Sequence, residues 1–107
     1  MSYQTIEPSE LYARMGRGES PLLIDVREPE EYALARIEGA RLLPLSRFQE
    51  WAGALNPEEE TVFICHHGIR SAHVCAVLAR QGFRRLLNLS GGIDLWSKEV
   101  DPNVPRY

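Results

Sequence analysis

The hydrophobic positions of this chain fall into short, nearly continuous apolar runs that are separated by longer stretches of mixed character. The runs at 22–26 and 61–64 are typical of strands that are buried on both faces of a sheet. Shorter runs predict further strands at 3–6, 41–43 and 85–89. The pattern therefore predicts five strands.

The stretches between these strands have the apolar spacing of amphipathic helices. The predicted helices begin, in chain order, at Pro8, after the turn at 28–32, at Ser46, at Ala72 and at Gly91-Gly92. Leu11, Tyr12 and Met15 fall on one face of the first helix. Ser46 has the features of an N-cap, since Gln49 follows it at capping-box spacing. Strands that alternate with helices indicate an α/β domain with a mostly parallel sheet, in which sites lie beyond the carboxyl ends of the strands.

Composition narrows the classes of protein. A length of 107 residues with 44% hydrophobic positions suits one domain over 1–107. The formal net charge of -3 argues against nucleic acid and against an anionic membrane surface as partners. We find neither a signal-like first segment nor an apolar stretch of membrane-spanning length, so we expect a cytoplasmic protein without a membrane partner. In that setting its two cysteines are expected to be reduced thiols.

The six residues 65–70, Cys-His-His-Gly-Ile-Arg, carry the clearest chemical signal. They follow the predicted strand at 61–64 and precede a helical pattern that opens at Ser71. A cysteine in such a loop lies where backbone N–H groups and the helix dipole favour negative charge, and hence the reactive thiolate. Arg70 adds a permanent cation at which an anionic substrate can dock. The segment predicts a covalent active site with Cys65 as the nucleophile.

Three motifs of the chain resemble those of the rhodanese domain family and occur in the family's order and spacing. They cover residues 23–28, 31–32 and 37–40 for the first motif, 65–71 for the second, and 88–93 with Trp96 for the third. The resemblance implies a rhodanese-like α/β fold, with a central, mostly parallel five-stranded sheet flanked by helices on both faces, in a free-standing single domain. Arg36 departs from the family pattern, in which many members have histidine.

The resemblance implies a sulfurtransferase that requires no cofactor. The Cys65 thiolate would take the outer sulfur of thiosulfate or of a persulfide donor and hold it as a persulfide, from which a thiol or cyanide collects it. Arg70 would orient the anionic donor or stabilise the departing group, and Gly68 lets the loop turn tightly. Backbone N–H groups of the loop would converge on the sulfur. The loop residues expected to bind substrate are His66, His67, Gly68, Ile69 and Ser71, the last also as a helix cap and a source of a hydroxyl.

Two other functions occur on this fold. Cell-cycle phosphatases and some arsenate reductases have a similar loop, but with five residues between cysteine and arginine where this chain has four. The shorter loop suits a single sulfur atom better than a phosphate group. A single rhodanese domain also serves as a sulfur relay or binding module for a protein partner, and the loop does not separate that role from turnover of small molecules. No apolar stripe indicates an obligate partner, so we expect a monomer.

The remaining histidines and the second cysteine have simpler interpretations. His66, His67 and His73 fit no standard zinc spacing with Cys65, so we predict no metal site. The two loop histidines are expected to line the entrance and to add adjustable positive charge. Cys75 is interpreted as a packing residue within the helix that follows the loop.

Overall fold

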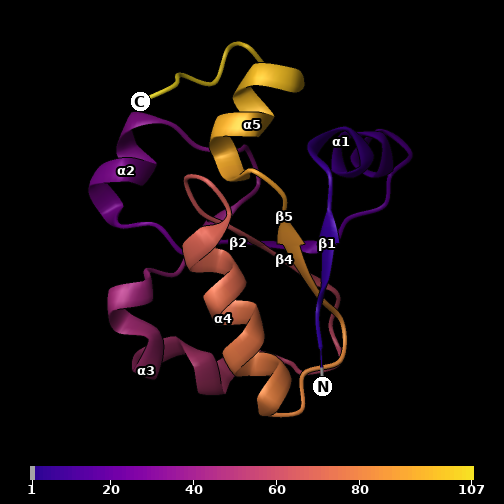
Figure 1. Ribbon diagram of the computed structural model, residues 1–107, viewed down its shortest axis with the longest axis vertical. Coiled ribbons are helices and arrows are strands. Elements are labelled where there is room, and N and C mark those ends of the chain that lie inside the picture. Colours follow the sequence, from indigo (N-terminus) through magenta and orange to yellow (C-terminus); the bar gives the residue numbers. More distant parts are fainter. Residues whose placement is uncertain (1) are drawn as a thin grey trace.

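Five parallel strands form one sheet, in the order β1-β5-β4-β2-β3, in the computed structural model, which describes residues 2–107 (Figure 1). The strands are β1 (Gln4–Ile6), β2 (Leu22–Asp25), β3 (Arg41–Leu42), β4 (Thr61–Ile64) and β5 (Leu86–Leu89). The predicted five-stranded sheet is confirmed, and no predicted strand end is wrong by more than one residue.

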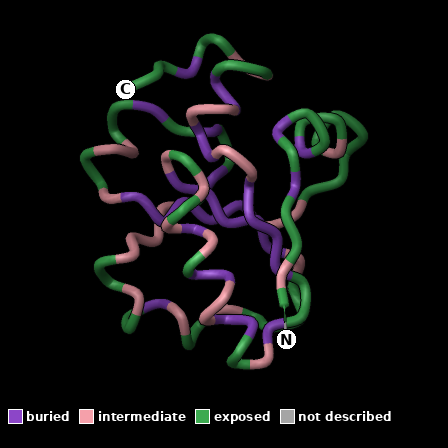
Figure 2. The backbone as a smooth tube through the Cα atoms, in the orientation of Figure 1, coloured by how far each residue is buried: buried purple, intermediate pink, exposed green. Residues whose placement is uncertain are grey.

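Helices cover both faces of this sheet. They are α1 (Pro8–Gly16), α2 (Pro29–Leu34), α3 (Phe48–Trp51), α4 (Ile69–Arg80) and α5 (Gly92–Glu99). Leu11 of α1 and Trp96 of α5 join one core cluster, whereas Trp51 of α3 and Leu78 of α4 join a second cluster on the other face. Because both faces are covered, every residue of β4 and β5 is buried, and buried backbone concentrates in the central strands (Figure 2).

Strand alternation directs the side chain that follows β4 toward α4. Val62 and Ile64 point into the cluster with α1 and α5, while Phe63 and Cys65 belong to the cluster with α3 and α4. The sheet register pairs Ile64 with Asp25 of β2, and Phe63 with Asn88 of β5. The carboxyl ends of β2, β4 and β5 therefore meet at one edge of the sheet.

One local prediction on a helix cap is wrong. In α1, Leu11 is fully buried, whereas Tyr12 is 60% and Met15 36% exposed. Tyr12 packs edge-on against Trp96 of α5, with the ring centroids 6.2 Å apart. Ser46 does not cap a helix: its hydroxyl donates to Glu28 Oε1 at 2.6 Å.

The segment predicted as one helix from Ser46 is a series of short turns. A 3₁₀ turn (Leu45–Arg47) precedes α3, and a second 3₁₀ turn (Ala52–Ala54) follows it. The Leu45 N–H donates to the carbonyl of Val26 at 3.0 Å, which ties the start of this segment to the end of β2. That tether sets the direction of the chain before a longer helix can begin.

The segment after α5 returns to the carboxyl edge of the sheet. Val104 is buried in the cluster with α1 and α5, and its carbonyl accepts a hydrogen bond from the Ser97 hydroxyl. The chain then reaches Tyr107, which lies close to α2 (Figure 1). Within residues 2–107, no helix is both long and apolar enough to cross a membrane.

Candidate active site

Cys65 lies directly after β4, between the ends of β2 and β5, as the parallel sheet predicts. The residue is only 1% exposed, so the sulfur lies at the floor of the loop and not on the surface. The loop then leads into α4, a helix of 12 residues whose first turn lies beside the sulfur. The unpaired N–H groups of that turn favour negative charge there.

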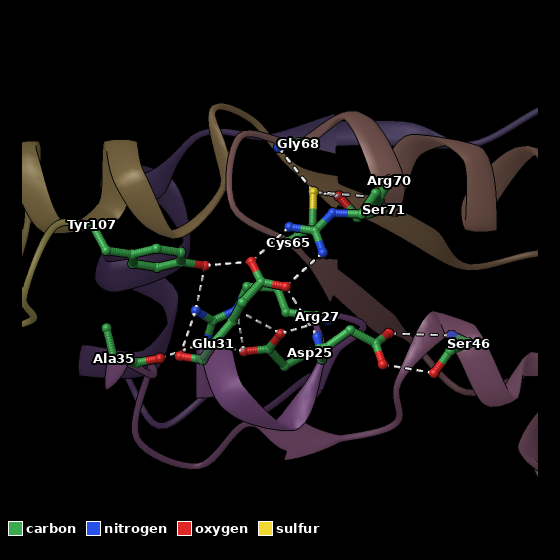
Figure 3. A network of polar contacts seen from close by, with 11 residues as sticks. Asp25, Arg27, Glu31, Ala35, Ser46, Cys65, Gly68, Arg70, Ser71 and Tyr107 are labelled. Atoms are coloured by element: carbon green, nitrogen blue, oxygen red, sulfur yellow. Dashed lines mark hydrogen bonds and ion pairs between the residues drawn. The ribbon is translucent and has the colours of Figure 1, made fainter. Parts of the chain in front are cut away.

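Three hydrogen-bond donors surround the sulfur (Figure 3). The Gly68 N–H lies 3.1 Å from Sγ, the Ser71 N–H 3.4 Å and the Ser71 hydroxyl 3.3 Å. Two of the backbone groups of the loop thus converge on the sulfur. This arrangement can stabilise a negative charge on Sγ, as in a thiolate.

Asn88 of β5 organises these donors. Its Oδ1 lies 2.5 Å from the Ser71 hydroxyl, and its Nδ2 donates to the Gly68 carbonyl at 3.0 Å. The Ser71 hydroxyl has one proton, so Asn88 and Cys65 compete for it. Sequence reasoning missed Asn88 as a site residue, although a polar residue within the apolar run Leu-Leu-Asn-Leu was the available signal.

Two glycines permit the loop to approach α5. Gly68, and not Ser71, is the N-cap of α4, with φ of 92°, and a Cβ there would lie 3.2 Å from the Leu89 carbonyl. Gly92 opens α5 with φ of 62°, and a Cβ there would lie 2.5 Å from the His66 carbonyl and still closer to that of Cys65. Only glycine fits both positions without displacing the backbone.

Arg70 does not point at the sulfur as an unpaired cation. Its two terminal nitrogens donate to the Glu31 carboxylate at 2.7 and 2.9 Å (Figure 3). The Tyr107 hydroxyl donates to the same carboxylate at 2.8 Å, and these bonds, mainly those from Arg70, lower the pKa of Glu31 to about 2. An anionic donor oriented by Arg70, as predicted, would therefore meet a guanidinium that is already bound to a carboxylate.

The polar contacts among Arg70, Glu31 and Tyr107 continue into the core through Arg27. Its guanidinium donates to both Asp25 oxygens, the closest contact being 2.7 Å, and both side chains are fully buried. Arg27 also lies 2.8 Å from the Tyr107 hydroxyl and donates to the backbone carbonyls of Glu31 and Ala35. The carboxylate partner of Arg27 is therefore Asp25, and Glu31 offers Arg27 only its backbone carbonyl.

The two loop histidines form a stack with Tyr107. The His66 ring lies 3.9 Å from the Tyr107 ring at an interplanar angle of 8°, and 3.9 Å from the His67 ring at 28°. Burial lowers the pKa of His66, which favours its neutral form and counts against a positive charge at this position. His67 is more exposed, with Nε2 4.0 Å from Asp94.

The histidines and Asp94 also offer donor atoms within 4.8 Å of one another. Asp94 is also paired with Arg106 at 3.0 Å.

The remaining residues noted in the sequence do not belong to the groups that donate hydrogen bonds to the Cys65 sulfur. Cys75 is fully buried in α4, and burial raises the pKa of its thiol to about 12. It therefore stays a thiol, as a packing residue should. Ile69 is 78% exposed, and its side chain faces solvent at the rim of the loop. Arg36 stacks over the ring of Tyr32, 5.0 Å from its centroid.

The fold and the loop define a class of protein, and comparison with known sequences agrees. Residues 7–99 match the family described as "Rhodanese-like domain", and the chain belongs to that family. A "Sulfurtransferase" of Allochromatium vinosum is 35% identical over 99 residues, which cover 92% of this chain and 92% of the relative. The "Rhodanese-like/PpiC domain-containing protein 12, chloroplastic" of Arabidopsis thaliana is 44% identical over 89 residues.

Coverage differs between these relatives. The match with the Arabidopsis protein covers 79% of this chain and 30% of the relative, so the chain spans less than a third of that protein's length. Among solved structures, a rhodanese-related protein from Thermoplasma volcanium superposes with a TM-score of 0.83 at 30% identity, over 98% of this chain and 100% of that one. The rhodanese-like fold is therefore shown for nearly the whole chain.

Proposed function

We propose that the chain is a sulfurtransferase that carries a sulfur atom on Cys65 as a persulfide. The observation that carries the proposal is a buried sulfur on which two backbone N–H groups converge, with the Ser71 hydroxyl 3.3 Å away, in a loop of the rhodanese family. A relative that shares nearly the full length of the chain is named a sulfurtransferase, which supports the same chemistry.

The reaction has two displacement steps. In the first, the Cys65 thiolate attacks the outer sulfur of the donor; a new S–S bond forms, and the bond within the donor breaks. Sulfite leaves with the bonding electron pair when thiosulfate is the donor, and a thiolate leaves when the donor is a persulfide. In the second, a thiol or cyanide attacks the outer sulfur, and the Cys65 thiolate departs.

The loop residues have distinct roles in this scheme. The Gly68 and Ser71 N–H groups point at Sγ, where they would stabilise the thiolate, and the same groups would stabilise the outer sulfur once it is bound. Asn88 holds the Ser71 hydroxyl and the Gly68 carbonyl, and so fixes the positions of the donors. Arg70, His66 and His67 lie at the rim, where the donor enters and the leaving group departs.

Intact mass spectrometry tests the proposal directly. Incubation with thiosulfate should add one sulfur atom to the protein, and cyanide should then remove it with release of thiocyanate. The Cys65→Ser variant should gain nothing, whereas Cys75→Ala should load like the wild type, because Cys75 is fully buried and its thiol stays protonated. Retention of full transfer activity by Cys65→Ser would end the proposal.

The same experiment separates a small-molecule enzyme from a relay. Loading from thiosulfate and discharge to cyanide, both without a second protein, would indicate turnover of small molecules. Loading that is discharged only by a protein thiol would indicate a sulfur relay to a protein acceptor. Hydrolysis of an aryl phosphate by the wild type, with no sulfur adduct, would instead favour the phosphatase chemistry of the related loops.

A further inference from the structure

The only guanidinium within the active-site loop is already occupied by a carboxylate. Both terminal nitrogens of Arg70 are bonded to Glu31, at 2.7 and 2.9 Å, in the bidentate geometry that a guanidinium uses to bind oxyanions. Figure 3 shows the Arg70 guanidinium beside Cys65, between the sulfur and the Glu31 carboxylate. Glu31 thus stands beside the reaction centre, where an anionic donor would meet Arg70.

Glu31 is held firmly in this place. Its carboxylate accepts two hydrogen bonds from Arg70, one from the Tyr107 hydroxyl at 2.8 Å and one from the Glu28 N–H at 3.1 Å. These donors come from three separate parts of the chain, and the Tyr107 ring is itself fixed by its stack on His66. With four donors, the carboxylate remains ionised at any pH at which the protein would be assayed.

The two neighbouring arginines do not replace the positive charge of Arg70 that Glu31 neutralises. Arg27 is paired with Asp25 inside the core, and Arg106 is paired with Asp94 at the rim. The entrance therefore presents cations whose charge is balanced locally. Such an entrance attracts a doubly charged donor less strongly than an unpaired arginine would. The Glu31 carboxylate also repels that donor.

We propose that Glu31 is a donor-selectivity residue, which by pairing with Arg70 biases the site toward singly charged sulfur donors over dianions such as thiosulfate. The inference rests on the proposed sulfur-transfer function and names the class of donor that it favours. Glu31 is 21% and Arg70 35% exposed, so solvent screens the effect only in part. Chemically, the site then prefers the persulfide of a thiol or a thiosulfonate.

Two donors that differ in one charge provide the test. Thiosulfate is a dianion, and methanethiosulfonate replaces one of its oxygens by a methyl group and carries a single charge. Each transfers its outer sulfur by the same displacement. The quantity to measure is the ratio of kcat/KM for thiosulfate to kcat/KM for methanethiosulfonate, with cyanide as the acceptor at low ionic strength.

The wild type and three variants should differ in this ratio in a characteristic order. Glu31→Gln should raise it about three-fold over the wild type, because removing one negative charge several ångströms away favours a dianion over a monoanion. Gln also suits the N3 position of the capping box, which Glu31 occupies in the first turn of α2. Arg70→Gln should lower the ratio, since Glu31 is then unbalanced. The double variant, with neither charge, should return near the wild-type ratio.

Two further variants are matched controls. Tyr107→Phe keeps the ring on His66 and leaves Glu31 charged, so the ratio should stay near that of the wild type. Glu28→Gln removes a carboxylate that binds Ser46 and not Arg70, so its shift should be smaller than that of Glu31→Gln. High salt should diminish the shift caused by Glu31→Gln.

The outcomes separate this inference from the proposed function. A ratio that is unchanged or lower in Glu31→Gln overturns the inference, and so does a double variant that keeps the ratio of Glu31→Gln. Either result leaves the Cys65 persulfide intact, because mass spectrometry reports loading independently of donor preference. If neither donor loads wild-type Cys65, the proposed function itself fails.

Discussion

Replacing Gly92 with alanine tests whether the start of α5 fixes the active-site loop. The added Cβ would lie 2.5 Å from the His66 carbonyl and still closer to that of Cys65, and both partners are backbone atoms that cannot rotate away. The same two carbonyls accept hydrogen bonds from the Ile93 and Asp94 N–H groups, at 2.9 and 3.1 Å. The substitution therefore pushes α5 away from the two residues that begin the loop.

The expected loss of stability has two parts. Alanine at the positive φ of Gly92 costs about 1 kcal/mol for the backbone conformation alone. Steric overlap adds about 1–3 kcal/mol, and weakening the hydrogen bonds to the two carbonyls adds about 1 kcal/mol. We expect the free energy of unfolding to fall by about 3–5 kcal/mol.

Gly82 provides the matched control. It has φ of 96°, and a Cβ there would have nothing within 4 Å, so Gly82→Ala carries only the backbone part, about 1 kcal/mol. The difference between the two variants isolates the close approach to the loop. Gly82 follows α4 at the end away from Cys65, so its substitution should leave the rate of sulfur loading unchanged, whereas Gly92→Ala should slow loading at least ten-fold.

Urea unfolding followed by tryptophan fluorescence measures the first effect, since Trp51 and Trp96 are 7% and 4% exposed and report on both core clusters. Timed mass spectrometry with thiosulfate measures the second. Equal destabilisation by the two alanines would refute the steric argument. Normal loading by a strongly destabilised but folded Gly92→Ala would show that the contact supports the fold without setting the geometry around the sulfur.

Three further variants test the polar network. Ser71→Ala should slow loading about ten-fold and destabilise the fold by about 1–3 kcal/mol, because Asn88 Oδ1 loses its donor; unchanged loading kinetics would contradict the role of the hydroxyl. The pKa of Glu31 falls from 4.5 to about 2 on folding, so its contribution of roughly 2–3 kcal/mol is complete above about pH 5 and lost toward pH 2; urea titrations should show a flatter acid limb in Glu31→Gln. Asp25→Asn leaves Arg27 buried without its counter-ion and should cost about 3–5 kcal/mol by urea unfolding; a loss below about 1 kcal/mol would count against a charged pair.

The fold was largely predictable from the chain because its strands carry an unambiguous pattern. The apolar runs at 22–26 and 61–64 leave no polar face, which requires cover on both sides and therefore a parallel sheet between helices. The position of Cys65 at the edge of the sheet followed from that topology. The details that failed, the helix caps at Ser46 and Ser71, depend on which partner each hydroxyl meets in the folded chain.

Only those site residues that lie close to Cys65 in the sequence were predictable. The donors from Gly68 and Ser71 lie within six positions of Cys65 and follow from the loop and helix start. Three other residues reach the loop from distant parts of the chain: Asn88 from β5, Glu31 from α2 and Tyr107 from the segment after α5. The periodicity of the sequence does not predict such contacts. The sequence could therefore place Arg70 near the sulfur but not reveal the carboxylate that binds it.

This pairing changes which interaction stabilises negative charge on the sulfur. If Arg70 were unpaired, it would be the natural counter-charge to a thiolate or persulfide. Since its guanidinium is bound to Glu31, the N–H groups of Gly68 and Ser71 carry that task, and they do so only while the loop keeps its shape. The shape depends on Gly92, where α5 meets the loop backbone, so a residue that touches no substrate should control the rate of sulfur transfer more strongly than the arginine in the loop.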